Sequence, residues 1–279
     1  MRKKWIILLF ALITFPSVYS QNNDKLIVDE GVLNASTKQV NQFFRRFNGE
    51  ESTKGVRYYE GDKDYRNPSL RNKYLNVLFD NSNASITDPV KNDFIKKVIN
   101  QSNPEFLDFH GDGWFAEVIT KFLYQGADVY ITLYMNLEKE NEGYKWVMND
   151  VYFPHFKSLF SNHNDNTPRF LHPMSHEIDF MNLIRVFRDK DYVDKYVKKD
   201  FEPDYLSLFL YELKKGNLKY QSVTNLKFHF FQIEGWYFEI SDFNRPGANS
   251  GWLISNLMKI ERQEDIETIN KFIRHEDEN

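Results

Sequence analysis

The stretch Asp-Gly-Trp-Phe-Ala-Glu-Val at residues 112–118 has a counterpart in Glu-Gly-Trp-Tyr-Phe-Glu-Ile at residues 234–240. In each stretch, the acidic-Gly pair between aromatic runs predicts a tight hairpin turn. Because side chains alternate along a strand, the two tryptophans should face the helices, and every second residue should lie on the opposite face. We expect that opposite face to pack between domains, to meet a partner, or to be an ordinary solvated surface. Its residues are Phe115, Glu117, Tyr237 and Glu239.

The sequence around these two stretches repeats in the same order. Apolar residues spaced as on one face of a helix occur in 40–47 and again in 180–187, and each set belongs to a predicted first helix. A later helix is expected to begin at Asp88-Pro89 in one half and at Glu202-Pro203 in the other, since an acidic residue before proline suits a helix start. The shared order favours an internal duplication. The alternative is a single mixed domain with accidental echoes.

The duplication leads to an α+β fold class with two similar cone-shaped domains, each of about three helices followed by a curved antiparallel sheet. The first domain is assigned to residues 21–155 and the second, which includes a C-terminal helix, to residues 174–279. Residues 156–173 are rich in Asn, His, Ser and Pro, and are assigned to a linker. We expect Trp114 to pack on the apolar face of the helix predicted at 40–47. We expect Trp236 to pack on Leu183, Ile184 and Phe187 of the corresponding helix in the second half.

This order of elements, with its Gly-Trp stretches, resembles the nuclear transport factor 2-like, or cystatin-like, superfamily. The resemblance covers about residues 36–153 and 175–260. It implies a sheet that wraps a long helix and forms a cone with a pocket at its open end. Within it, the chain is similar to exported bacterial proteins of unknown function with two such domains in tandem. Because the superfamily includes enzymes, binding modules and dimerisation units, the resemblance leaves the function open.

Residues 1–20 have the pattern of a signal peptide. Three basic residues precede an eleven-residue apolar run that ends at Phe15, and small or apolar residues at 18 and 20 suit cleavage after Ser20. Eleven apolar residues are too few to span a bilayer of about 30 Å, so we expect cleavage and a periplasmic or secreted protein with no membrane span. An uncleaved N-terminal anchor is the alternative. The chain has no cysteine, which excludes disulfides and a lipoprotein cysteine.

Charge argues against a nucleic-acid partner. Without residues 1–20 the chain has 33 basic residues against 40 acidic ones, whereas a phosphate-binding surface needs a positive balance. The partners that remain are a small molecule, a glycan or a protein ligand. The tryptophans could stack on sugar rings if they were exposed, but their matched apolar positions favour burial in a core. The four in question are Trp114, Trp146, Trp236 and Trp252.

The densest cluster of potential metal ligands is His172-Pro-Met-Ser-His176-Glu177. Two histidines four residues apart share a face of a helix, as a zinc site requires. Pro173 makes a helix between them unfavourable, and Ser175 suits the N-cap of a helix that begins afterwards. We therefore expect a loop that enters a helix, with metal binding as the alternative.

The sequence contains no catalytic motif that we can assign. His110 and Asp112 could form an acid–base pair, but neighbouring turn residues point apart, and turn chemistry explains Asp112. His155, His163 and His229 have no acidic or nucleophilic neighbour at a recognisable spacing. An isomerase-like site would need acidic and phenolic groups in the cone, yet no pattern brings the available ones together. The available groups are Tyr74, Asp108, Tyr124 and Tyr196.

The sequence therefore predicts no catalytic, cofactor-binding or metal-binding residue, and no cofactor. The expected function is that of an exported, non-enzymatic binding or interaction protein of the bacterial envelope. Two alternatives remain, an enzyme of the isomerase or hydrolase class that uses the pocket, and a structural dimerisation unit.

Overall fold

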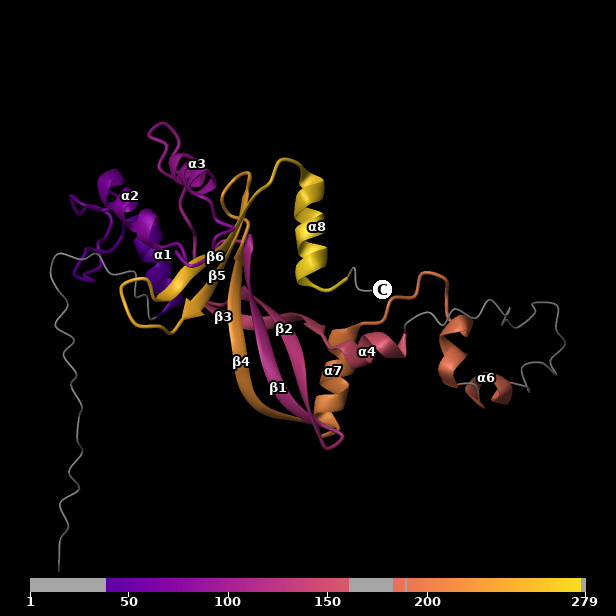
Figure 1. The fold of residues 1–279 in the computed structure, drawn as a ribbon. Coiled ribbons are helices and arrows are strands. Elements are labelled where there is room, and N and C mark those ends of the chain that lie inside the picture. Colours follow the sequence, from indigo (N-terminus) through magenta and orange to yellow (C-terminus); the bar gives the residue numbers. More distant parts are fainter. Residues whose placement is uncertain (1–38, 161–182, 189, 277–279) are drawn as a thin grey trace, which may run out of the picture. The chain divides into compact units, whose positions relative to one another are not determined.

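The protein is an α+β protein built on one antiparallel sheet, as a computed structural model shows (Figure 1). The structure describes residues 39–160, 183–188 and 190–276. The expected signal peptide and the arm that follows it lie outside these residues, as does most of the predicted linker. Contacts group Leu33–Asn279 into one compact unit, to which the description below applies.

The sheet has six strands in the order β3-β2-β1-β4-β5-β6, so its two central strands come from opposite halves of the chain. Strand β1 pairs with β4 from Trp114↔Phe230 to Tyr124↔Leu218, and the two strands run side by side in Figure 1. The strands are β1 (Trp114–Tyr124), β2 (Ala127–Glu140), β3 (Gly143–Tyr152), β4 (Leu218–Phe230), β5 (Trp236–Phe243) and β6 (Gly251–Lys259).

Three helices supply the core that covers one end of the sheet. They are α1 (Val40–Asn48), α2 (Pro68–Val77) and α3 (Asp88–Val98). Helix α1 ends at Gly49, whose left-handed φ of 71° suits glycine, and α2 begins with the Asn67 side chain accepting hydrogen bonds from two backbone amides. The apolar residues of these helices form one cluster with the even-numbered side chains of β1, so the predicted helix-facing side is confirmed for that strand.

A second cluster lies at the far end of β1 and β2. Helix α4 (Pro154–Leu159) and helix α7 (Tyr205–Lys214) contribute Phe156 and Phe209, which pack with Phe122 of β1. Phe122 has the same parity along β1 as Trp114, so these helices and the first three cover the same face of that strand. The ring centroids of Phe122 and Phe209 are 5.7 Å apart.

The opposite face of the sheet is contacted by the C-terminal helix α8 (Gln263–Ile273), which confirms the expected helix in this region. Ile269 and Ile273 of α8 pack on Phe115 and Tyr237. The remaining helical segments are α6 (Ile184–Arg188) and the 3₁₀ helix η1 (Lys190–Tyr196). No helix among the residues that the structure describes has both the length and the apolar character needed to cross a membrane.

Both Gly-Trp tryptophans are core residues, but only one has the predicted neighbours. Trp114 and Trp236 are each 4% exposed. The ring of Trp114 lies 4.9 Å from that of Phe44 in α1, as expected. Trp236 instead packs 5.3 Å from Phe94 of α3. The prediction for Trp236 was wrong because α3, from the first half of the chain, covers β5.

Two of the three residues predicted to cover Trp236 are themselves exposed. Ile184 is 53% exposed and Phe187 is 65% exposed. The helix predicted to begin at Glu202-Pro203 was also misplaced. In the structure, α7 begins at Tyr205, with Asp204 as its N-cap. An aspartate whose side chain accepts from the Ser207 amide is the stronger start of a helix.

The two hairpin predictions had different outcomes. Glu234-Gly235 lies in the five-residue connection between the paired strands β4 and β5, as predicted. Asp112-Gly113 was wrongly predicted as a hairpin turn, because no strand among the described residues precedes it and β1 begins directly after it. Both glycines have a left-handed φ, of 83° and 76°, so each redirects the backbone just before its tryptophan.

The strands of the two predicted domains thus belong to one sheet. The predicted α+β class is confirmed. The predicted division into two cone-shaped domains is not confirmed. The sequence between the halves, residues 156–173, begins inside α4 and continues beyond the described residues.

Candidate functional site

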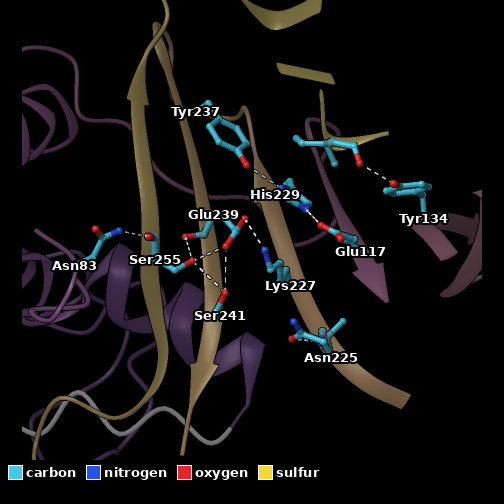
Figure 2. Close-up of polar contacts among 12 residues, drawn as sticks. Asn83, Glu117, Tyr134, Asn225, Lys227, His229, Tyr237, Glu239, Ser241 and Ser255 are labelled. Carbon is cyan, nitrogen blue, oxygen red and sulfur yellow. Dashed lines mark hydrogen bonds and ion pairs between the residues drawn. The ribbon is translucent and has the colours of Figure 1, made fainter. Parts of the chain in front are cut away.

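Ionisable and polar groups gather on the sheet face opposite α1–α3, and most of them hydrogen-bond one another (Figure 2). The face includes Phe115, Glu117, Tyr237 and Glu239, as the strand alternation predicted, so these residues do share a face. Strands β1, β4 and β5 bring these side chains together, although Glu117 and Tyr237 are 120 residues apart in sequence.

His229 is the centre of this group. It lies on β4, is 1% exposed, and uses both ring nitrogens. Its Nε2 atom lies 2.9 Å from Oε2 of Glu117 on β1, and its Nδ1 atom lies 2.9 Å from the hydroxyl of Tyr237 on β5. The imidazole also stacks on the ring of Phe115, with centroids 4.9 Å apart. One side chain therefore joins the three strands.

The environment of Tyr237 fixes the proton of its phenol. Burial, followed by the nearby charges of Glu239 and Glu117, raises the pKa of Tyr237, so its phenol keeps its proton. The Tyr237 hydroxyl can donate to Nδ1 of a neutral imidazole or accept from a protonated one, and the Nε2 hydrogen donates to the Glu117 carboxylate in either state. Each group then has a partner of the correct polarity.

The pKa of Glu117 results from opposing effects. Burial works to raise it, but the hydrogen bond with His229 and the attraction of His229 and Lys227 outweigh burial. The pKa of Glu117 therefore lies below its ordinary value. Glu117 is ionised at neutral pH although its side chain is only 12% exposed.

A second cluster on the same face surrounds Glu239. Its Oε1 atom accepts hydrogen bonds from the hydroxyls of Ser255, at 2.7 Å, and of Ser241, at 3.2 Å. Its Oε2 atom lies 3.3 Å from Nζ of Lys227. The backbone carbonyl of Ser255 accepts from Asn83, which connects this cluster to the loop before α3 (Figure 2).

Helix α8 covers one end of this polar face and is held there by specific contacts. The hydroxyl of Tyr134 donates to the carbonyl of Ile273 at 2.6 Å, and Nη1 of Arg274 lies 2.7 Å from Oδ2 of Asp150. The guanidinium of Arg274 also lies 5.7 Å above the ring of Phe115. The helix thereby shields the rings that stack on His229.

The Tyr–His–Glu chain has the donors and acceptors of a proton relay, but its Tyr237 end is closed. A general acid or base must come within hydrogen-bond reach of a substrate. Tyr237 is 2% exposed, and its hydroxyl is already bonded to His229. The arrangement fits a buried hydrogen-bond network that links the strands and in which every member has a partner.

The acid–base pair considered at His110 and Asp112 is not formed. The backbone amide of His110 donates to Asp108, and its ring stacks on Tyr144 with centroids 4.3 Å apart. The backbone carbonyl of Asp112 accepts a hydrogen bond from the side chain of Gln232.

The structure also separates the phenols and the carboxylate that an isomerase-like site would need. The hydroxyl of Tyr74 donates to the carbonyl of Ser52, and Tyr124 packs on Phe153 at the other end of β1. Asp108 is exposed before β1, and Tyr196 ends η1. Of the two other tryptophans, Trp252 is buried, whereas Trp146 is 38% exposed.

The cluster from His172 to Glu177 and the residue His163 lie outside the described residues. Within the part of the chain that the structure describes, no three His, Asp or Glu side chains form a group that could hold a metal ion.

The sequence interpretation missed His229. His229 and Tyr237 lie on the paired strands β4 and β5. The hairpin predicted at Glu234-Gly235 could therefore have indicated that the two residues lie on one face. Its bond to Glu117 depends on the pairing of β1 with β4, which no local pattern reveals.

Three cavities are lined by residues other than Glu117, His229 and Tyr237. A cavity of about 440 Å³ lies beside α1, and one of about 630 Å³ lies between α3 and β6. A third, of about 590 Å³, lies beside α8, where the buried side-chain oxygen of Asn136 has no hydrogen-bond partner. Arginines concentrate in the first cavity, which is lined by Arg45, Arg57 and Arg66.

Comparisons with protein-family models, with curated proteins and with solved structures found no match to this chain.

Proposed function

We propose that the protein is an exported binding or interaction protein and that its buried histidine chain serves the fold. The observation that carries the proposal is the closure of this chain. Both nitrogens of His229 and the hydroxyl of Tyr237 bond within the protein, and both residues are buried. The cavity beside α1 and the cavity between α3 and β6 lie away from this chain, and their charged side chains suit recognition of a ligand.

Export is supported by the sequence of residues 1–20, with its basic start, its eleven-residue apolar run and its small residues before position 21. Mass spectrometry of the protein purified from an exporting host tests this part. We expect a chain that begins at Gln21. A mass that retains Met1 or Trp5 would contradict it.

The resemblance to the nuclear transport factor 2-like superfamily remains part of the proposal. One antiparallel sheet with three helices on one face supports it. In this form, the resemblance applies to a single sheet that draws strands from both repeats. The tandem organisation into 21–155 and 174–279 stays a prediction from the sequence.

A ligand screen that also follows chemical conversion tests the binding function. Compounds that raise the melting temperature are incubated with the protein and then recovered for mass spectrometry. We expect bound compounds to be recovered unchanged, from the parent protein and from the His229→Gln variant alike. A compound that the parent converts and His229→Gln does not would establish the enzyme alternative. A library without any stabilising compound would contradict a small-molecule ligand.

A further inference from the structure

The cavity beside α1 has the features of a site for an organic anion. It encloses about 440 Å³ between helix α1, the segment after it, and the residues just before β1. Three arginines line it, Arg45, Arg57 and Arg66, against two carboxylates, Glu50 and Asp108. The whole chain carries a net charge of −4, so this local excess of positive charge runs against the overall balance.

The arginines differ in how far the protein already satisfies them. Arg66 is engaged, since its guanidinium lies 2.8 Å from Oε1 of Glu50. Arg45 uses Nε for the buried carboxylate of Glu51, and its terminal nitrogens form no hydrogen bond with the residues that the structure describes. No carboxylate among those residues pairs with Arg57, whose guanidinium lies 5.0 Å from the ring centroid of Tyr59.

The backbone that carries Arg57 is held in place. The amide of Ser52 donates to Val56 at 2.7 Å, and the amide of Tyr58 donates to Glu50 at 2.8 Å. The hydroxyl of Tyr74 in α2 donates to the carbonyl of Ser52 at 2.6 Å, which fastens this turn to the helix. Arg57 is therefore presented by an ordered segment, and binding would require little reordering of the backbone.

The guanidinium of Arg66, which lines the cavity, is positioned by a neighbouring ring. The ring of Phe106 lies 4.2 Å from the guanidinium of Arg66 and 4.2 Å from that of Arg71. Arg71 is buried and donates to the carbonyls of Phe47 and Val98, the last turns of α1 and α3. Burial lowers the pKa of Arg71 to about 10, which still leaves it charged at neutral pH. These contacts set the position of Arg66 at the cavity edge.

Rings supply the apolar part of the lining. Phe44 and Phe109 pack edge to face, with centroids 5.1 Å apart, and both border the cavity with Tyr65. A ligand that pairs with arginine through a carboxylate can place an aromatic or aliphatic body against these rings. An inorganic anion would leave that part of the cavity unused.

We infer that this cavity binds a small organic carboxylate, with Arg57 and the free nitrogens of Arg45 holding the carboxylate and the Phe44–Phe109 wall holding its apolar body. The inference rests on the proposed binding function and names the class of ligand and the place where it binds.

Titration of isotope-labelled protein by nuclear magnetic resonance tests the inference, with 2-naphthoate as the probe and 2-naphthamide as its uncharged analogue. We expect 2-naphthoate to bind at least about tenfold more tightly than 2-naphthamide, since a charge-assisted hydrogen bond exceeds a neutral one by about this much. Inorganic phosphate should bind more weakly than 2-naphthoate. Equal affinity for naphthoate and naphthamide, no binding of naphthoate, or phosphate binding as tight as naphthoate would each overturn the inference.

Matched variants locate the site. Arg57→Gln should weaken naphthoate binding about tenfold, whereas Arg188→Gln, which changes an exposed arginine in α6, should bind like the parent. Asp108→Asn removes one of the two carboxylates, keeps an oxygen that can accept from the His110 amide, and should strengthen binding. An unchanged affinity in both Arg57→Gln and Asp108→Asn would overturn the inference. If library compounds bind unconverted while naphthoate does not, this inference fails and the binding function stands.

Discussion

The two faces of the sheet are stabilised in different ways. On the helix-covered face, rings form a continuous stack, with Trp114 to Phe230 at 5.5 Å and Phe230 to Phe238 at 4.7 Å between centroids. On the opposite face, His229 links Glu117 and Tyr237 through two hydrogen bonds. Apolar burial is non-directional, so its contribution grows with the area removed from water. The polar chain depends on pairs, so losing one member leaves another without a partner.

The largest effect is expected on the aromatic face. Trp114→Ala and Trp236→Ala should each lower the free energy of unfolding by about 3–5 kcal/mol through lost burial and the cavity left behind. Urea denaturation followed by circular dichroism measures this loss. Total stability is typically about 5–15 kcal/mol, so either variant can be partly unfolded.

Trp146→Ala is the matched control for the aromatic face. Trp146 packs against Trp114 with centroids 5.5 Å apart, but it is 38% exposed. We expect a clearly smaller loss than for the two buried tryptophans. A free energy of unfolding equal to that of the parent in Trp114→Ala and Trp236→Ala would show that these residues are not core and would favour a surface that stacks on sugar rings.

The next effect concerns the polar face and tests its dependence on pairs. His229→Phe keeps a ring beside Phe115 but leaves Glu117 and Tyr237 without their partner, at about 1–3 kcal/mol for each orphaned group. Tyr237→Phe removes one hydroxyl and keeps the ring, so it should cost about 1 kcal/mol. Urea midpoints of the two variants give the comparison. A loss for Tyr237→Phe as large as that for His229→Phe would contradict pairwise stabilisation.

The smallest effect is a dependence on pH. Because the pKa of Glu117 is lower in the folded than in the unfolded protein, its ionisation stabilises the fold above the ordinary glutamate pKa of about 4.3. This contribution is lost as the pH falls below that value and through the folded pKa. Glu117→Gln should be less stable than the parent at pH 7, and the difference should shrink towards pH 3. Denaturation midpoints at both pH values measure it, and a difference that grows on acidification would contradict the assignment.

Local patterns predicted the helices and strands better than the contacts between them. The burial of Trp114 and the shared face of Glu117 and Phe115 follow from alternation within one segment, and the structure contains them. The cover over Trp236 was misassigned because α3 comes from the other half of the chain. Pairing of β1 with β4 joins residues more than 90 positions apart, and helical or strand periodicity carries no information on such distant contacts.

The same limit applies to the candidate sites. The oxygen of Glu117 that bonds His229 lies on a strand 112 residues away, so the chain of three groups emerges only when the sheet is assembled. The arginine cavity is nearer in sequence, since Arg45, Arg57 and Arg66 lie within 22 residues of one another. The turn that carries Arg57 towards Arg45 has no periodic pattern that would have indicated this cavity.

The central claim is that the histidine chain maintains the fold and that ligand recognition belongs to the arginine cavity. Thermal melts of His229→Phe and Arg57→Gln, each with and without 2-naphthoate, test it most directly. The account predicts that His229→Phe melts below the parent but keeps the ligand-induced rise in melting temperature, and that Arg57→Gln melts like the parent but loses most of that rise. The opposite pattern, with His229→Phe as stable as the parent and unable to respond to the ligand, would contradict it.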